Sequence, residues 1–237
     1  MQKLLPILIC LLFLLWIRDA AAAEHHPLCP DKSKFIGDVE RRKILKLHTE
    51  FRKQLAEGKA AGHRGGTLPL AKNLYVMRWS CFLEVIARVE AENCSRYYNY
   101  IVPYGQNTMY FSNSDMIDFM GKMELIKFAM EQWALPAQHY GVSRNNKYKD
   151  ERLYTFANMA YAGIREVGCH FEQCNDGYGF VKDAVFVCVY GAEVPTNALL
   201  YEKGTEPGCT ASDCSLIENS TCLGLLCDAP HDPTSML

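Results

Sequence analysis

The chain contains 237 residues, with 25 lysines and arginines against 27 aspartates and glutamates, a formal net charge of −2, and 11 cysteines. This balance excludes the basic footprint that a nucleic acid or an anionic membrane surface requires, so neither is an expected partner. The length suits one large domain with an appendage better than two full domains.

Residues 1–23 have the pattern of a secretory signal peptide. Lys3 precedes an apolar run over residues 4–17, and four alanines follow at positions 20–23. A charged start, an apolar centre and small residues before the cleavage site are typical of such leaders. The run is short for a membrane span and no stop-transfer pattern follows it, so we expect a secreted, extracellular chain without a stable membrane anchor. The mature chain then has 23 basic and 26 acidic residues, a net charge of −3.

Three amphipathic helices are predicted, because apolar residues recur every three or four positions. The first covers residues 38–58 and the second covers residues 79–94. The third covers residues 115–133, and its apolar stripe runs through Phe119, Met123, Ile126, Met130 and Trp133.

Two strands are predicted in the second half of the chain. Residues 166–171 and 184–190 are short apolar runs, and the second is rich in β-branched and aromatic side chains. Such runs are typical of buried strands. Helices and strands in this mixed order favour an α+β domain or a three-layer α/β/α domain.

Ten cysteines follow the leader, and an even number in an exported chain predicts a closed disulfide framework. They are Cys29, Cys81, Cys94, Cys169, Cys174, Cys188, Cys209, Cys214, Cys222 and Cys227. Their spacing lacks the Cys-x-x-Cys pairs of zinc sites, so zinc ligation by cysteine is not expected. Residues 208–237 carry four of the cysteines and few apolar residues, so this tail must depend on its bridges.

Two N-x-Ser/Thr sequons begin at Asn93 and Asn219. In an exported chain such sequons are glycosylation acceptors. Cys94 occupies the middle position of the first sequon, next to a predicted bridge, which favours Asn219 as the acceptor.

Five short motifs follow one another between about residue 35 and residue 198. The first helix contains HTEFR from residue 48 and LAEG from residue 55, and MRWSCFLE begins at residue 77. YGQN begins at residue 104, FANMAY and VGC lie between residues 156 and 169, and VCVY ends at residue 190. In sequence and order these segments resemble the CAP superfamily, which comprises cysteine-rich secretory, antigen 5 and pathogenesis-related 1 proteins. Cys29 and the cysteine-rich tail most resemble the venom allergen-like, activation-associated secreted proteins of parasitic nematodes.

The resemblance implies a fold and part of a disulfide pattern. Residues 24–207 are expected to form a three-layer α/β/α sandwich with a central antiparallel sheet, followed by a hinge-like tail at 208–237. Cys169 is expected to pair with Cys188, and the four tail cysteines are expected to pair among themselves. The order in which the remaining four pair with one another stays open; these are Cys29, Cys81, Cys94 and Cys174.

Members of the superfamily often hold a divalent metal between two histidines and two glutamates. The matching positions here carry Tyr98, Gln106, Pro136 and Thr155. Zinc favours imidazole, thiolate or carboxylate ligands, which none of these residues supplies. We therefore expect neither a metal nor another cofactor.

Catalysis is not expected either. The sequence contains no G-x-S-x-G, H-E-x-x-H or catalytic-cysteine motif, and His48, His63, His139 and His170 lie outside any nucleophile or metal motif. Sequence patterns do not test for a catalytic triad whose residues come together only in the folded structure. The chain is thus interpreted as a binding protein rather than an enzyme.

Aromatic residues concentrate between residues 97 and 111, at the position of a loop that binds sterol in some CAP proteins. A tyrosine suits such a site because it combines an apolar face with one orienting hydroxyl. The alternative is ordinary packing of a long loop. The candidate sterol-binding residues are Tyr97, Tyr98, Tyr100, Tyr104 and Tyr110.

Two further partners are considered. The resemblance implies a fatty-acid channel between the first helix and the helix ending near Trp133. Its expected lining is Ile44, Leu47, Ile126 and Met130, which packing into the core explains equally. The alternative to a lipid-binding parasite effector is a module that binds a host receptor or adhesion protein through its loops and has no lipid role.

Overall fold

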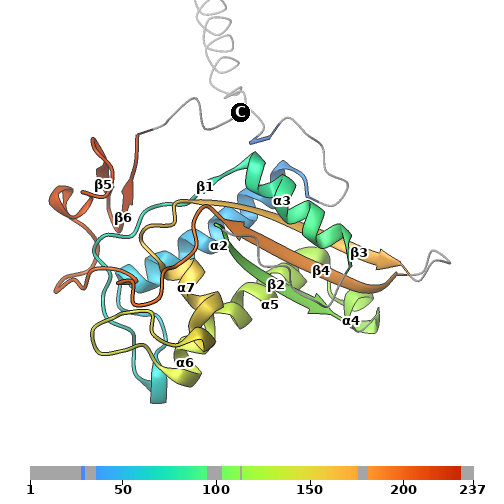
Figure 1. The fold of residues 1–237 in the computed structure, drawn as a ribbon, viewed down its shortest axis with the longest axis horizontal. Helices are drawn as coiled ribbons and strands as arrows, with labels where there is room; N and C mark the ends of the chain where they lie inside the picture. Colours follow the sequence, from blue (N-terminus) through green and yellow to red (C-terminus); the bar gives the residue numbers. More distant parts are fainter. Residues whose placement is uncertain (1–27, 30–35, 95–102, 113, 176–180, 231–237) are drawn as a thin grey trace, which may run out of the picture.

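The computed structural model describes residues 28–29, 36–94, 103–112, 114–175 and 181–230, and its centre is a four-stranded sheet (Figure 1). The strands are ordered β1 (Arg78–Trp79), β3 (Glu166–Asn175), β4 (Val181–Tyr190) and β2 (Gly105–Phe111). β4 pairs antiparallel with both β3 and β2, whereas the two-residue β1 runs parallel to β3. The predicted antiparallel pairing therefore holds for the three long strands.

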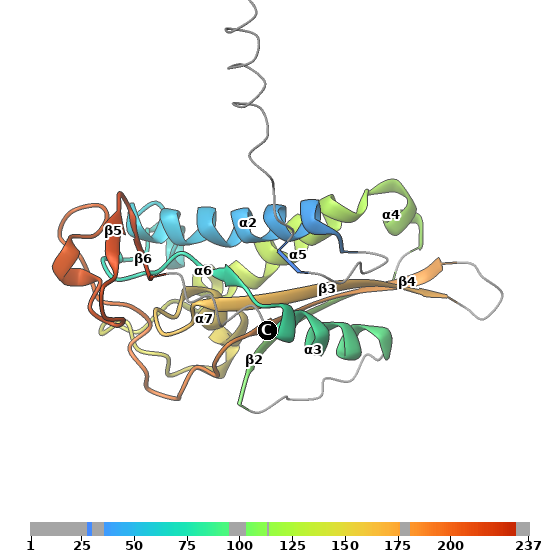
Figure 2. The same ribbon diagram turned by 90° about the horizontal axis from the view of Figure 1, so that it is seen from above.

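Helices cover both faces of this sheet. α3 (Cys81–Glu92) packs on one face, while α2 (Asp38–Ala56) and α5 (Lys122–Ala134) lie over the other, as Figure 2 shows. α7 (Tyr154–Ala160) packs against both α2 and α5. The three-layer α/β/α prediction is thus confirmed. In the part of the chain that the structure describes, no helix combines the length and apolarity needed to cross a membrane.

The remaining elements are short. Two of them, α4 and α6, are helices of six and five residues, and three are 3-10 helices. A two-stranded sheet lies in the tail. These elements are α4 (Ser114–Phe119), α6 (Pro136–Tyr140), η1 (His63–Gly65), η2 (Glu151–Leu153), η3 (Ala211–Asp213), β5 (Thr221–Leu223) and β6 (Leu226–Asp228).

The alternation of side chains along β4 explains why an apolar core lies on each side of the sheet. Val185, Val187 and Val189 pack with α3. Phe186 and Tyr190, from the alternate positions, pack in the larger core with α2 and α5. A strand buried on both faces has a nearly continuous apolar sequence, as the run at 184–190 does.

α3 lies so close to β3 that only glycine fits at position 168. A Cβ atom on Gly168 would lie 2.1 Å from the backbone nitrogen of Glu84 and 2.6 Å from the carbonyl oxygen of Ser80. Backbone atoms at the start of a helix cannot move aside without shifting the helix. The glycine of the VGC segment is therefore required by packing.

Gly168→Ala is expected to lower the free energy of unfolding by about 2–3 kcal/mol, because the added methyl group displaces the backbone of α3. Urea unfolding of the secreted protein measures this loss. Gly66→Ala is the matched control, since the nearest atom to its new Cβ is 3.5 Å away. Equal losses in the two variants would contradict the close packing of α3 on β3.

The third predicted helix is interrupted. α4 ends at Phe119 and α5 begins at Lys122, with Gly121 as an N-cap at φ −58° and ψ 153°. Met130 and Trp133 are buried as predicted, but Phe119 is 91% exposed. The predicted apolar stripe is therefore wrong at Phe119. The break at Gly121 changes the phase of the helix, so Phe119 does not lie on the same face as Met130 and Trp133.

The sequence predicts a long loop over residues 97–111, but residues 105–111 form strand β2. Gly105 lies opposite Tyr190 and Phe111 lies opposite Ala184, so β2 pairs with β4 along its whole length. Glycine and asparagine are depleted in strands, which conceals this strand in the sequence. Residues 97–102 lie outside the described part of the chain.

Five disulfides join the ten cysteines from Cys29 onward. The Cys169–Cys188 bridge implied by the resemblance is present and joins directly opposed residues of β3 and β4. The tail cysteines pair among themselves, again as implied. The pairs that sequence left open are Cys29–Cys81 and Cys94–Cys174, which attach the two ends of α3 to the segment before α2 and to β3.

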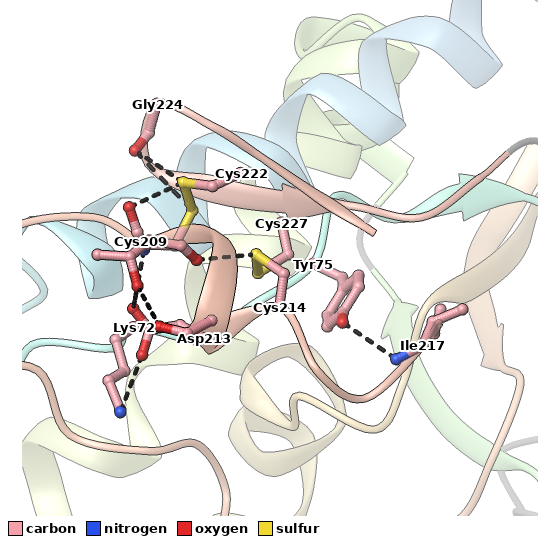
Figure 3. Close-up of a disulfide and its surroundings, with 11 residues drawn as sticks. Lys72, Tyr75, Cys209, Asp213, Cys214, Ile217, Cys222, Gly224 and Cys227 are labelled. Carbon is pink, nitrogen blue, oxygen red and sulfur yellow. Dashed lines mark hydrogen bonds and ion pairs between the residues drawn. A yellow bond between two sulfur atoms is a disulfide. The ribbon is translucent and has the colours of Figure 1, made fainter. Parts of the chain in front are cut away.

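The tail docks on residues 72–78 of the main domain (Figure 3). Lys72 Nζ lies 2.9 Å from Asp213 Oδ1, and the backbone nitrogen of Ile217 donates to the hydroxyl of buried Tyr75 at 3.2 Å. β6 adds backbone hydrogen bonds to residues 74 and 76. Charge, side-chain and backbone contacts thus hold the described part of the tail against the domain.

Candidate ligand-binding sites

A groove of about 220 Å³ opens between α2 and α5. Leu47 and Phe51 of α2 line one side, Met130 and Ala134 of α5 line the other, and Met159 of α7 also lines the groove. Met130 and Met159 are buried, whereas Leu47 and Phe51 are only half-buried. The groove is therefore an apolar surface that is open to solvent.

The rim of this groove is polar. Glu50 and Gln54 line it from α2, and Lys127 and Glu131 line it from α5. Lys127 Nζ lies 4.0 Å from Glu131 Oε1, and both side chains are more than half exposed. An exposed pair of this kind contributes about 0–1 kcal/mol, so Lys127 can exchange its partner easily.

The structure places two of the four residues that the resemblance predicted to line a fatty-acid channel on this groove. Leu47 and Met130 line the groove as predicted, but Ile44 and Ile126 are fully buried in the main core and do not reach it. Phe51 follows Leu47 at helical spacing, which is a signal that could have identified it. No local pattern connects Met159 with α2 and α5.

The metal-binding positions of the superfamily are occupied by unsuitable groups. The hydroxyl of Thr155 donates to the carbonyl of Trp133 at 3.1 Å, and Pro136 begins α6 without offering a ligand. The buried Oε1 of Gln106 has no hydrogen-bond partner in the described part of the chain, but it is a single neutral ligand. Tyr98 lies outside the described residues. These groups do not fit a divalent metal.

A sulfur cluster in the tail does not offer a metal site either. The Sγ atoms of Cys209, Cys214 and Cys227 lie within 4.8 Å of one another. Cys209 is bonded to Cys222, and Cys214 is bonded to Cys227. Zinc binds the thiolate form of cysteine, which these bridged sulfurs cannot adopt.

A buried polar network connects β2, β4 and α2. Asn107 Nδ2 donates to the Tyr190 hydroxyl at 3.2 Å, and this hydroxyl lies 3.2 Å from His48 Nε2. His48 Nδ1 lies 2.9 Å from the carbonyl oxygen of Ile44. A neutral imidazole with its proton on Nδ1 satisfies both contacts. Burial lowers the pKa of His48 to about 4, so the ring is neutral at pH 7.

The described tyrosines of the predicted sterol site have packing partners. The Tyr104 ring meets the exposed ring of Phe82 edge-on at 6.1 Å. The Tyr110 hydroxyl donates to Asp183 Oδ2 at 2.7 Å. The other three tyrosines lie outside the described residues; they are Tyr97, Tyr98 and Tyr100.

Both predicted glycosylation acceptors are exposed. Asn93 is the C-cap of α3, and Asn219 lies in the tail with a φ of 60°. Exposure is required for modification, and the glycosylation of either residue stays a prediction.

Comparison with known proteins places this fold in a family. Residues 45–190 match the model of the cysteine-rich secretory protein family, CAP. The chain therefore belongs to the CAP family, as the sequence resemblance indicated. The motifs of the first helix, of α3 and of the closing strand β4 lie within or at the edge of this match.

The curated relatives are secreted or venom proteins by name. "Ancylostoma secreted protein" of Ancylostoma caninum is 30% identical over 229 residues, which are 96% of this chain and 51% of the relative. The chain thus spans about half the length of that relative. "Venom allergen 5.02" of Vespa crabro is 30% identical over 181 residues, or 73% of this chain and 84% of the relative. These names and the five disulfides agree with an extracellular location.

Solved structures share the fold. Na-ASP-1 has a TM-score of 0.72 at 28% identity, with 86% of this chain and 48% of that chain covered. NaASP2, solved with Zn²⁺, has a TM-score of 0.66 at 27% identity, with 81% and 95% covered. BmVAL-1 has a TM-score of 0.73 at 24% identity, with 86% and 99% covered, and supports the fold alone.

Proposed function

We propose that this protein is a secreted, non-catalytic carrier that binds a fatty acid in the groove between α2 and α5. The observation that carries the proposal is an open apolar groove with one ammonium group, Lys127, on its rim. An acyl chain on Leu47, Phe51 and Met130 removes apolar surface from water, at about 0.8 kcal/mol per buried methylene. The ligand carboxylate then pairs with Lys127.

The size of the groove favours an acyl chain over a sterol. Pockets for drug-sized ligands span about 300–1,000 Å³, and this groove holds only about 220 Å³. A narrow, flexible chain fits such a space better than four fused rings. Sterol binding therefore remains assigned, as a separate prediction, to the tyrosine-rich segment at residues 97–110.

A metal has no part in the proposed function. NaASP2 was solved with Zn²⁺, but Gln106, Pro136 and Thr155 replace the ligands expected in the family. An effector that docks on a host receptor is the second candidate, and a failure of lipid binding would favour it.

Leu47→Glu is expected to weaken saturable palmitate binding at least about tenfold, because it places a carboxylate against the acyl chain. Equilibrium binding of labelled palmitate to the secreted protein, competed with unlabelled palmitate, measures the change. Val39→Glu is the matched control: Val39 lies on the same helix, is 63% exposed and does not line the groove. Lys127→Glu is expected to weaken binding two- to fivefold, as the loss of about one exposed ion pair implies.

Labelled cholesterol provides the second arm of this experiment. If the tyrosine-rich segment binds sterol, replacing Tyr98, Tyr100 and Tyr104 by serine abolishes cholesterol binding and leaves palmitate binding intact. Palmitate binding that survives Leu47→Glu would exclude the groove. Absence of saturable binding of either lipid would exclude the carrier function and favour receptor docking.

A further inference from the structure

A second pocket, of about 520 Å³, lies away from the α2–α5 groove. It forms where the segment leading into α7 meets the segment that follows β4. The backbone nitrogen of Tyr148 donates to Ala198 at 2.8 Å, and that of Asn197 donates back to Tyr148 at 2.6 Å. The pocket is lined by Tyr148, Glu151, Tyr154, Glu193, Val194, Pro195 and Thr196.

The charge of this pocket is negative. Glu151 and Glu193 line it, and neither carboxylate has an ion-pair partner among the residues that the structure describes. No lysine or arginine is among the described lining residues. The nearby cation of Arg152 is engaged elsewhere, because it pairs with Asp150 at 2.7 Å and lies over the Tyr140 ring at 4.3 Å.

Tyr148 is the buried polar group of the pocket. It is only 6% exposed, and its hydroxyl makes no hydrogen bond to any described residue. Burial raises the pKa of this hydroxyl to about 12, with smaller contributions from Tyr154 and from the carboxylates of Glu151, Asp150 and Glu193. Tyr148 thus lines the pocket together with Glu151 and Glu193, and its hydroxyl is available to a ligand there.

We infer that this pocket binds a protonated primary amine carried on a small apolar body. The two carboxylates neutralise the ammonium charge, and the tyrosine faces attract a cation through their π-electrons. The Tyr148 hydroxyl accepts a hydrogen bond from the ammonium group. Val194 and Pro195 supply apolar surface for the rest of the ligand.

Isothermal titration calorimetry with the secreted protein at pH 7 tests the inference. The probes are 2-phenylethylamine and its neutral counterpart 2-phenylethanol. We expect saturable binding of the amine that is at least tenfold tighter than that of the alcohol. Glu151→Gln combined with Glu193→Gln should abolish this preference, whereas Glu206→Gln, at an exposed site outside the pocket, should preserve it.

Two further measurements distinguish amine binding in this pocket from binding in the α2–α5 groove and from binding of a metal cation. Tyr148→Phe should weaken binding of the primary amine several-fold but leave its N,N,N-trimethyl derivative unaffected, because only the primary amine donates to the hydroxyl. Leu47→Glu in the α2–α5 groove should change neither. Equal affinity for amine and alcohol would overturn the inference, as would saturable Ca²⁺ binding that displaces the amine.

Discussion

Replacing Arg52 by methionine is expected to lower the free energy of unfolding by about 4 kcal/mol or more. Arg52 is completely buried, and its guanidinium donates to four backbone carbonyls at 2.7–3.0 Å. No carboxylate pairs with it in the described part of the chain. The acceptors are the carbonyl oxygens of Tyr75, Met159, Tyr161 and Ile164.

The expected loss is large because methionine leaves the carbonyls of Tyr75, Met159 and Ile164 without these donors, at about 1–3 kcal/mol for each unsatisfied group. The Tyr161 carbonyl keeps one partner, because it also accepts from the backbone nitrogen of Ile164 at 3.1 Å. Burial lowers the pKa of the Arg52 guanidinium to about 9, which still leaves it charged at neutral pH. Arg52→Lys keeps the charge but not the planar arrangement of donors, so we expect a smaller yet clear loss.

Urea unfolding of the disulfide-intact protein measures both changes at Arg52. Lys53→Met, at the neighbouring half-buried position, is the matched control and should shift stability by about 0.5 kcal/mol or less. A loss below about 1 kcal/mol for Arg52→Met would mean that the four carbonyls find other donors.

The second large effect is a loss of stability in mild acid that depends on His48. Burial is the main cause that lowers the folded-state pKa of His48 from 6.5 to about 4, with a smaller contribution from Arg52. Between these two pH values the unfolded chain binds more protons than the folded one. The contribution of His48 is therefore fully present above about pH 6.5 and is lost as pH falls to 4, by about 3 kcal/mol in all.

The hydrogen bonds of His48 explain why its protonation is unfavourable. The neutral ring accepts from the Tyr190 hydroxyl, which itself accepts from Asn107. A protonated Nε2 would be a second donor to that hydroxyl and would leave its proton without this acceptor. Burial also lowers the pKa of His170 to about 4, so His170 adds acid sensitivity in the same direction.

Urea unfolding at a series of pH values between 7 and 4 tests the role of His48. His48→Gln is expected to be less stable than the parent at pH 7 but to lose less stability on acidification. His139→Gln, at an exposed position, is the matched control. A parent-like pH dependence in His48→Gln would show that His48 is not an acid-sensitive group.

Patterns within one element predicted much of this structure. The helical spacing from residue 38 onward and the apolar run at 184–190 correspond to α2 and β4. The motifs from HTEFR to VCVY identified the family, and the cysteine count agreed with five bridges. Such features succeed because side-chain period and residue type act over a few neighbouring positions.

Features that depend on pairing between distant segments were missed. β2 has a weak strand sequence and exists because β4 supplies its hydrogen-bond partners over residues 105–111. The lining of the α2–α5 groove was only half predicted, since helical spacing does not say which side of α2 faces α5. Met159 reaches the groove from α7, far away in the sequence.

Residue patterns alone were thus enough to identify the family, helices α2 and α3, strands β3 and β4, and the residue types that replace the usual metal ligands. What Arg52 holds together, and which segments form the pocket around Tyr148, follow only from the three-dimensional packing. Arg52 reaches carbonyls up to 112 residues away, and Tyr148 and Glu193 line one pocket only because two loops pair by backbone hydrogen bonds. The physical reason is that chain closure and packing bring such groups together, and no local period encodes them.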